Sequence, residues 1–265
     1  MDIIVPIKQV PETSRVKMDA ATGTMIRTGV ETVVNPLDLY AIEAALRLRE
    51  QYGGKVTAIS MGPKQALKAL KEALAMGCDN AVLVCDHQFA GSDTWATSYT
   101  LSCAVRILGH FDLIITGERA TDGDTGQVGP GLAAWLDIPA VTYAASICLS
   151  SDGDIVAERM VEEGYQRVQV TLPALISVVK EIGSVRLPTL KGKKKALQAE
   201  IPVISADKLS SFEPLWGLSH SPTKVVSIEK AIVVRQGRQV VVGKHFSEEE
   251  AVDQLIAFLE ERNLI

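Results

Sequence analysis

Short apolar runs alternate with longer amphipathic stretches along the first half of the chain. Short runs that are almost wholly apolar are typical of strands buried on both faces of a sheet. Stretches with apolar residues three and four positions apart are typical of helices. We expect strands at 2–7, 55–60, 80–85, 111–116 and 138–142, and helices at 36–52, 64–76, 94–108 and 131–136. This alternation predicts a parallel sheet with right-handed crossover connections.

The pattern changes after residue 144, where apolar and polar residues begin to alternate one by one. This alternation covers 146–149, 155–161 and 166–171, with turn residues between, and predicts an antiparallel meander. A further strand is expected at 175–179, and a small hairpin before residue 34. The predicted fold class is therefore α/β, with a doubly wound, mostly parallel sheet and an antiparallel meander.

Residues 196–246 contain few long apolar segments and are interrupted by prolines, which predicts an extended arm. Such a long segment is unusual in a compact domain unless it lies on something else. We therefore divide the chain into an α/β domain at 1–187 and an arm at 188–265 that contacts another chain. The arm ends in a helix at 249–262, opened by a capping box at 247–250. Within the arm, 191–195 is either a solvated lysine run or a subunit contact, and Trp216 is a candidate for burial against a partner.

The composition is that of an ordinary globular protein, with 265 residues of which 47% are hydrophobic and 22% charged. A net charge of −5 offers no electrostatic case for nucleic-acid binding. The apolar runs are too short to insert into a membrane, and the start of the chain does not resemble a signal peptide. The four cysteines and four histidines are scattered, which indicates reduced cysteines, a cytoplasmic location and no metal site.

A glycine-rich polar loop at 117–131 follows one of the predicted buried strands and precedes a predicted helix. Open α/β sheets bind ligands at such a place, outside the carboxyl ends of their strands. The glycines allow the backbone to approach a phosphate, and hydroxyl and amide side chains add donors. Asp122 and Asp124 would repel a phosphate, so we expect them to face ribose hydroxyls or loop amides. The alternative is an ordinary surface turn, because the loop matches neither of the two common nucleotide-binding glycine motifs.

Several segments resemble, in sequence order, the beta subunit of electron-transferring flavoproteins. They are Lys8-Gln9-Val10-Pro11, Asn35-Pro36-Leu37-Asp38, Ala73-Leu74-Ala75-Met76-Gly77, the glycine-rich loop, Leu172-Pro173-Ala174-Leu175 and Leu187-Pro188-Thr189-Leu190-Lys191. The resemblance is strong over about residues 1–200 and loose in the tail. It implies a doubly wound domain with a C-terminal arm that embraces an alpha subunit. It also implies a bound adenine nucleotide, which is AMP in simple members and a second FAD in electron-bifurcating members.

The resemblance also implies which residues hold this nucleotide. They are Pro6, Lys8, Asn35, Pro36, Leu37, Asp38, Met61, Gly62, Gly117, Glu118, Arg119, Ala120, Thr121, Asp122, Gly123, Asp124, Thr125, Gly126, Gln127 and Val128. Arg119 departs from the family, whose members usually have glutamine at this position. Its guanidinium could hold a phosphate, stabilise an anionic flavin or pair with a neighbouring carboxylate.

The segment from Asp122 to Pro130 resembles the bifurcating branch, which implies FAD in this subunit, with AMP as the alternative. Members of that branch exchange a hydride with NAD(H). They send one electron to ferredoxin or flavodoxin and the other, through the alpha subunit, to an acyl-CoA or lactate-type dehydrogenase. The chain would then act only as the electron-transfer subunit of an oxidoreductase complex, and no side-chain acid–base catalysis is expected. The alternatives are a simple AMP-binding shuttle subunit and, from another class, an adenine-nucleotide-binding regulatory domain.

Overall fold

The computed structural model describes residues 1–12, 17–18, 25–26, 31–226, 241–243 and 246–265. The chain divides into two compact units, Met1–Ile228 and Glu229–Ile265. The helices are α1 (Pro36–Tyr52), α2 (Leu67–Met76), α3 (Thr94–Leu108), α4 (Val128–Leu136), α5 (Leu190–Gln198) and α6 (Glu248–Glu261). The strands are β1 (Asp2–Pro6), β2 (Gln9–Pro11), β3 (Lys17–Met18), β4 (Met25–Ile26), β5 (Thr32–Val34), β6 (Lys55–Met61), β7 (Asn80–Val84), β8 (Leu113–Gly117), β9 (Ala140–Leu149), β10 (Ile155–Val161), β11 (Gly164–Val170), β12 (Ala174–Val178) and β13 (Val203–Ile204).

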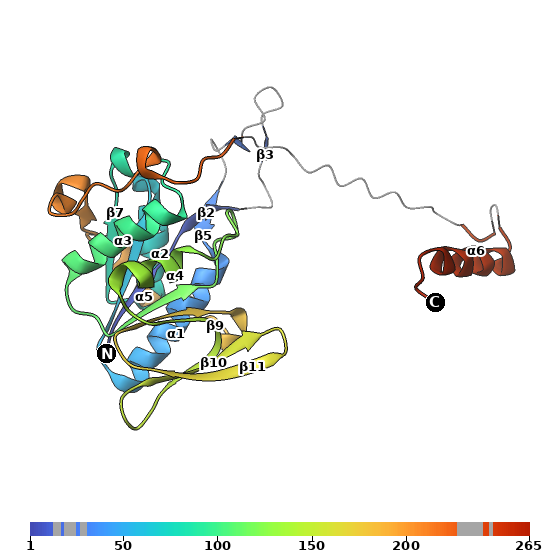
Figure 1. The fold of residues 1–265 in the computed structure, drawn as a ribbon, viewed down its shortest axis with the longest axis horizontal. Coiled ribbons are helices and arrows are strands. Elements are labelled where there is room, and N and C mark those ends of the chain that lie inside the picture. The colour runs from blue at the N-terminus through green and yellow to red at the C-terminus, as the bar shows by residue number, and fades with distance from the viewer. Residues whose placement is uncertain (13–16, 19–24, 27–30, 227–240, 244–245) are drawn as a thin grey trace. The chain divides into compact units, whose positions relative to one another are not determined.

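The larger unit is built on a nine-stranded sheet with the order β11-β10-β9-β12-β8-β1-β6-β7-β13. All neighbours from β9 to β13 in this order run parallel, whereas β9, β10 and β11 pair antiparallel. The predicted parallel sheet and meander are therefore confirmed, and they form one continuous sheet (Figure 1). The two strands expected at 138–142 and 146–149 are a single strand, β9. The strand continues between them through an irregularity in its pairing with β12 near Tyr143, whose φ is 60°.

Helices cover both faces of the sheet, as the predicted doubly wound arrangement requires. One apolar core lies on the side of α1 and α2 and includes Ile42, Leu46 and Leu70. The other core lies on the side of α3 and α4 and includes Val105 and Leu132. Because strands β1 and β8 are buried on both faces, they read as nearly continuous apolar runs in the sequence.

Two small antiparallel pairs follow β1. Strand β2 pairs with β5, and β3 pairs with β4, which confirms the hairpin expected before residue 34. Gly23 and Gly29, which are typical turn residues within this segment, lie outside the described residues.

The lysine run at 191–195 is part of a helix that the sequence analysis missed. Helix α5 begins after Thr189, whose hydroxyl accepts a hydrogen bond from Gly192 N at 2.9 Å. The helix packs on α2, with Ala196 buried. A Cβ at position 192 would lie 2.2 Å from the carbonyl oxygen of Ala75, so glycine is required for this close approach. The lysines hide the helix in the sequence because they occupy its solvent side and leave little apolar periodicity.

Part of the predicted arm packs on the larger unit itself. Strand β13 extends the sheet beside β7. Trp216, which is 5% exposed, packs against Phe89 with ring centroids 5.6 Å apart, and also stacks on Tyr99. The expectation that Trp216 is buried against a partner is therefore wrong. The apolar residues of this segment are widely spaced and fill gaps beside α3, so they show no periodicity in the sequence. That the later part of the arm contacts another chain stays a prediction.

The smaller unit contains α6, which begins one residue earlier than predicted. Its capping box is confirmed, because Ser247 N donates to Glu250 Oε2 at 2.8 Å and Glu250 N donates to Ser247 Oγ at 3.2 Å. The apolar side chains of the helix lie open, with Leu255 57% and Phe258 44% exposed. A helix that carries open apolar side chains has a surface suited to burial against another chain.

Candidate functional site

The predicted binding segments meet at one edge of the sheet. Strands β1, β6 and β8 are neighbours, and their carboxyl ends lead into Lys8, Met61-Gly62 and the glycine-rich loop respectively. The backbone of Lys8 is held on both sides, since Lys8 N donates to Asp38 Oδ2 at 2.7 Å and Lys8 O accepts from Asn35 N at 2.8 Å. The amide of Gly62 instead donates to Val84 O at 3.0 Å. The segments around 8, 35–38 and 117–124 thus form one assembly, and Met61-Gly62 ends the adjacent strand.

Asn35 fastens the glycine-rich loop to the start of α1. The sequence places it correctly before the helix, with Pro36 in the first helical turn, but its side chain makes no cap hydrogen bond. Instead, its Nδ2 donates to Arg119 O at 2.9 Å, and its Oδ1 accepts from Thr121 N at 3.1 Å. An amide side chain can serve both partners at once because it carries a donor and an acceptor. Asn35 therefore sets the course of the loop backbone.

Asp38 lies beneath the loop and is only 7% exposed. Burial raises the pKa of this carboxyl to about 7, although hydrogen bonds from the Lys8 amide, Asn35 and the Gly117 amide act in the opposite direction. The end of β8 approaches the start of α1 so closely at this point that residue 117 must be glycine. A Cβ on Gly117 would lie 2.5 Å from Asp38 Oδ1 and 2.8 Å from the carbonyl carbon of Leu37. The end of β8 and the start of α1 can touch only because residue 117 is glycine.

The tip of the loop is open to solvent. Residues 121–125 are all exposed, and a Cβ on Gly123 would meet no atom within 4 Å. The backbone turns sharply here, with Gly123 N and Asp124 N both donating to Ala120 O, at 3.3 and 2.8 Å. Asp124 has a φ of 54° and Gly126 a φ of 63°. The loop therefore presents its backbone to open space.

Ion pairs surround the loop tip. Lys8 Nζ contacts Asp122 Oδ1 at 2.6 Å, and Arg119 contacts Glu118 Oε1 at 2.6 Å and Asp124 Oδ1 at 2.5 Å. Of the roles considered for Arg119, pairing with a neighbouring carboxylate is the one seen in this structure. Asp122 and Asp124 face these cations, whereas the sequence analysis expected ribose hydroxyls or loop amides.

The helix after the loop begins without a side-chain cap. Helix α4 starts three residues earlier than predicted, and Gln127 caps none of its amides. The Oε1 of Gln127 accepts instead from Thr94 Oγ1 at 2.9 Å. Thr116 Oγ1 is buried and, within the described part of the chain, has no hydrogen-bond partner; a Cβ on Gly129 would lie 3.0 Å from it. An uncapped helix N-terminus attracts anions through its amides and its dipole.

A cavity of about 750 Å³ opens beside the loop, where the meander approaches β8 and β12. Three of its lining residues, Leu37, Glu118 and Arg119, belong to the predicted site. The others come from β9, β10, the turn after β10 and the segment after β12, and the sequence analysis missed them: Tyr143, Arg159, Met160, Val161, Glu162, Glu163, Val179, Lys180 and Glu181. The alternation of residues along β10 predicts which side chains share a face of the sheet. It does not predict that this face lies next to the glycine-rich loop.

Comparison with known proteins shows the family of the chain. The family model described as "Electron transfer flavoprotein domain" matches residues 22–209. The chain belongs to the electron transfer flavoprotein family. The resemblance drawn from the ordered motifs is therefore confirmed.

Several relatives of this family match along nearly the whole chain. An "Electron transfer flavoprotein subunit beta" of Thermoanaerobacterium thermosaccharolyticum is 44% identical over 266 residues, covering 100% of both chains. The "Caffeyl-CoA reductase-Etf complex subunit CarD" of Acetobacterium woodii is 38% identical and also covers 100% of both. A "Protein FixA" of Azorhizobium caulinodans is 42% identical over 97% of this chain and 93% of its own.

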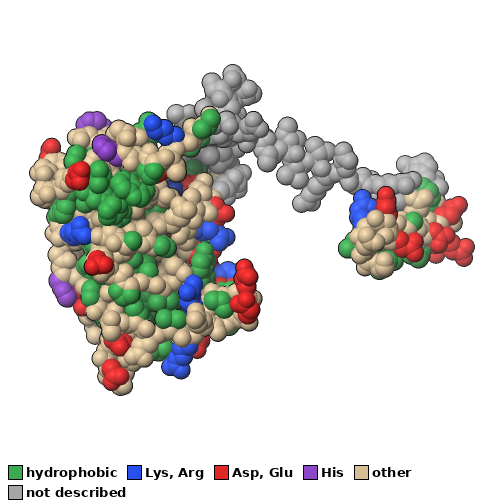
Figure 2. All heavy atoms as spheres, in the orientation of Figure 1, with side chains coloured by type: hydrophobic (Ala, Val, Ile, Leu, Met, Phe, Trp, Pro, Cys, Tyr) green, Lys and Arg blue, Asp and Glu red, His purple; other side chains and the backbone are tan. Residues whose placement is uncertain are grey.

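None of the helices described here is long and apolar enough to cross a bilayer. Among the same residues, no group of three or more His, Cys, Asp or Glu side chains is arranged to hold a metal ion. On the visible face of the larger unit, acidic and basic side chains are interspersed (Figure 2).

Proposed function

We propose that this chain is the beta subunit of an electron-transferring flavoprotein that binds FAD and takes part in electron bifurcation or confurcation. The uncapped start of α4, which follows the open loop tip at Gly123, carries the proposal. The name of the Acetobacterium woodii relative, a subunit of a caffeyl-CoA reductase–Etf complex, supports a role in a larger reductase complex. The alternative within the family is a simple shuttle subunit that binds AMP.

The residues at this edge fit a nucleotide that carries phosphates. A diphosphate needs several donors close together. Gln127 caps neither Val128 N nor Gly129 N at the start of α4, whereas Pro130 has no amide hydrogen and Gly131 N donates to Gln127 O at 2.9 Å, so the exposed loop before the helix would have to supply the remaining backbone donors. The buried Thr116 hydroxyl lacks a partner in the described structure and adds a further group that a ligand or an ordered water could satisfy. Lys8 and Arg119 bring positive charge to the same rim. A bound FAD would supply the hydride and single-electron chemistry.

The remaining site residues would act as a frame. Asn35 and Asp38 hold the backbones of Lys8 and of the loop in place, and Gly117 lets the loop leave β8 close to α1. Leu37, Glu118 and Arg119 line the neighbouring cavity, so the cavity adjoins this frame. These residues bind and orient, and the proposal assigns no proton transfer to any of them.

The proposed partners are an alpha subunit, which completes a heterodimer, and a flavin dehydrogenase of the acyl-CoA or lactate type. NAD(H) and ferredoxin or flavodoxin complete the proposed electron exchange. The open apolar side chains of α6 support a protein partner, because an unpartnered helix gains stability by burying them.

The test is to purify the heterodimer, denature it and quantify the released flavin and AMP. Two FAD per heterodimer without AMP support the proposal. One FAD and one AMP support the simple shuttle. A complex without flavin would leave the third candidate, a regulatory adenine-nucleotide-binding domain.

A further inference from the structure

We propose that Asp122 and Asp124 compete with the nucleotide's phosphates for Lys8 and Arg119, forming an electrostatic latch over the loop. Without nucleotide, Asp122 holds Lys8, and Asp124 shares Arg119 with Glu118. When the phosphates bind, the two aspartates release the cations. This inference rests on the proposed nucleotide-binding function. It reverses the role of the two aspartates, which then oppose binding although they lie within the binding loop.

The latch consists of side-chain ends attached to a fixed backbone. The backbone of Lys8 is anchored by Asp38 and Asn35, and the loop is anchored at Arg119 O and Thr121 N by the Asn35 side chain. The ion pairs join only the tips of long or exposed side chains across the gap between these anchors. Exchange of the cations from carboxylate to phosphate therefore requires rotamer changes and no movement of the frame.

Exposure makes these pairs easy to exchange. The side chains of Lys8 and Asp122 are 49% and 26% exposed, and those of Arg119 and Asp124 are 44% and 74% exposed. Ion pairs that face solvent contribute little, because water and salt screen them. The terminal phosphate of AMP and the whole diphosphate of FAD each carry about two negative charges, against one on a carboxylate, and both offer more acceptor oxygens to lysine and arginine. The cations therefore gain by changing partner, while the released aspartates can turn toward solvent at the open loop tip.

The latch and a direct ligand role for Asp122 predict opposite changes in nucleotide affinity when Asp122 is replaced. If Asp122 hydrogen-bonds the ribose, Asp122→Asn weakens nucleotide binding. If Asp122 occupies Lys8, the same change frees the lysine and strengthens binding. From the strength of exposed ion pairs we expect AMP to bind about two- to fivefold more tightly to Asp122→Asn than to the wild type.

The experiment uses the purified complex of the full chain with its alpha subunit, after removal of bound nucleotide. Binding of AMP, ADP and adenosine is measured by titration calorimetry for the wild type, Asp122→Asn and Lys8→Gln. Asp152→Asn is the matched control, because Asp152 lies in an exposed turn, where its carboxylate accepts a hydrogen bond from neighbouring Ser151 Oγ. We expect tighter AMP and ADP binding in Asp122→Asn, weaker binding in Lys8→Gln, and unchanged adenosine binding in both.

The outcomes separate the latch from the proposed function. Weaker or unchanged AMP and ADP binding in Asp122→Asn overturns the latch while leaving nucleotide binding intact. Equal gains in adenosine and AMP affinity also overturn it, because adenosine has no phosphate to receive the freed lysine. If the wild-type complex binds none of AMP, ADP or FAD at this subunit, the proposed function fails and the latch fails with it. Thermal unfolding of each variant without nucleotide shows whether the fold is retained.

Discussion

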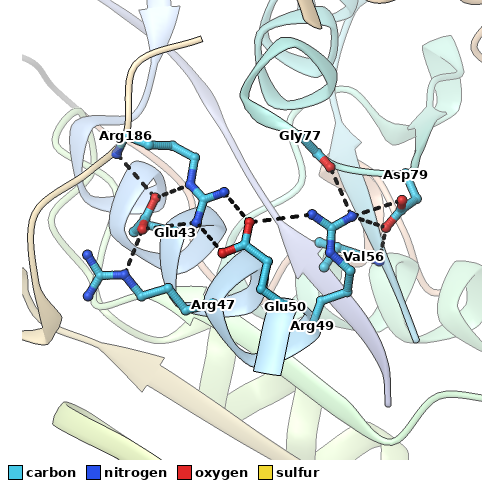
Figure 3. A network of polar contacts seen from close by, with 8 residues as sticks. All are labelled: Glu43, Arg47, Arg49, Glu50, Val56, Gly77, Asp79 and Arg186. Carbon is cyan, nitrogen blue, oxygen red and sulfur yellow. Dashed lines mark hydrogen bonds and ion pairs between the residues drawn. The ribbon is translucent and has the colours of Figure 1, made fainter. Parts of the chain in front are cut away.

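Replacing Arg186 tests how the segment after β12 is held on α1. Arg186 lies between two carboxylates of α1, Glu43 and Glu50, as Figure 3 shows. The Glu43 side chain is only 5% exposed and accepts from Arg186 Nε at 2.7 Å, from the Arg186 amide at 3.1 Å and from Arg47 Nε at 2.7 Å. Glu50 is half exposed. The ion pair of Arg186 with buried Glu43 should therefore stabilise the fold more than its ion pair with half-exposed Glu50.

The expected magnitude follows from burial. Arg186→Ala leaves Glu43 with Arg47 and one amide but removes two charged hydrogen bonds, from Nε and from Nη2 at 3.3 Å. A hydrogen bond to a buried charged group contributes about 1.5–3 kcal/mol, and the longer second bond adds less. We expect Arg186→Ala to lower the free energy of unfolding by about 2–4 kcal/mol. Glu50→Ala is the control and should cost about 0–1 kcal/mol, since its pair faces solvent.

The pH dependence gives this prediction a second test. Burial alone would raise the pKa of Glu43, but hydrogen bonds from Arg186 and Arg47 outweigh it and hold the pKa below its ordinary value. A carboxyl with a lowered folded pKa stabilises the fold above its unfolded pKa, and this stabilisation is lost as pH falls through the folded pKa. The difference between wild type and Arg186→Ala should therefore shrink as pH falls below about 4.

The assay is urea unfolding followed by circular dichroism, at pH 7 and at several lower values. Equal losses in Arg186→Ala and Glu50→Ala at pH 7 would refute the reasoning from burial. A loss in Arg186→Ala that stays constant down to pH 3 would refute the assignment of the stabilisation to ionised Glu43.

Three further changes test other parts of the fold. Gly117→Ala should cost about 1–3 kcal/mol in urea unfolding because its Cβ would overlap α1, whereas Gly123→Ala, with open space around it, should stay within about 0.5 kcal/mol. Because the folded pKa of Asp38 is raised to about 7, wild-type stability should fall relative to Asp38→Asn as pH rises from about 4 to 7; parallel pH curves would contradict this. Trp216→Ala should cost about 3–5 kcal/mol, and Trp95→Ala, at 38% exposure, clearly less; equal thermal shifts would contradict the packing described.

The order of strands and helices could be predicted because burial leaves a strong periodic signal. Strand β8 is buried at every position, and its apolar run ends where Gly117 turns the chain. The capping box of α6 was equally readable because both of its hydrogen bonds are local in sequence. Helix α5 was missed because its solvent side is a run of lysines.

The candidate site was predicted only as far as its parts are local. The glycine-rich loop stands out by composition, but the cavity beside it is completed by Tyr143 and Arg159 from the meander. Which strand edges meet depends on the sheet order, in which β12 lies between β9 and β8. The residues of β9 do not indicate that β12 pairs between β9 and β8. The cavity-lining residues of β9 and β10 could therefore not be derived from the sequence.

The difference between Asp38 and Asp122 shows what burial adds to a sequence motif. Both are aspartates beside the same loop, and both belong to segments that the family resemblance assigns to nucleotide binding. Asp38 is buried and receives the amide of Lys8, whereas Asp122 is exposed and contacts the ammonium group of the same lysine. One residue, Lys8, is thus bound through its backbone by one carboxylate and through its side chain by another, and we propose that only the second contact exchanges. A nucleotide that competes for the ammonium group need not disturb the amide, so the rim can respond to a ligand while the frame beneath it stays in place.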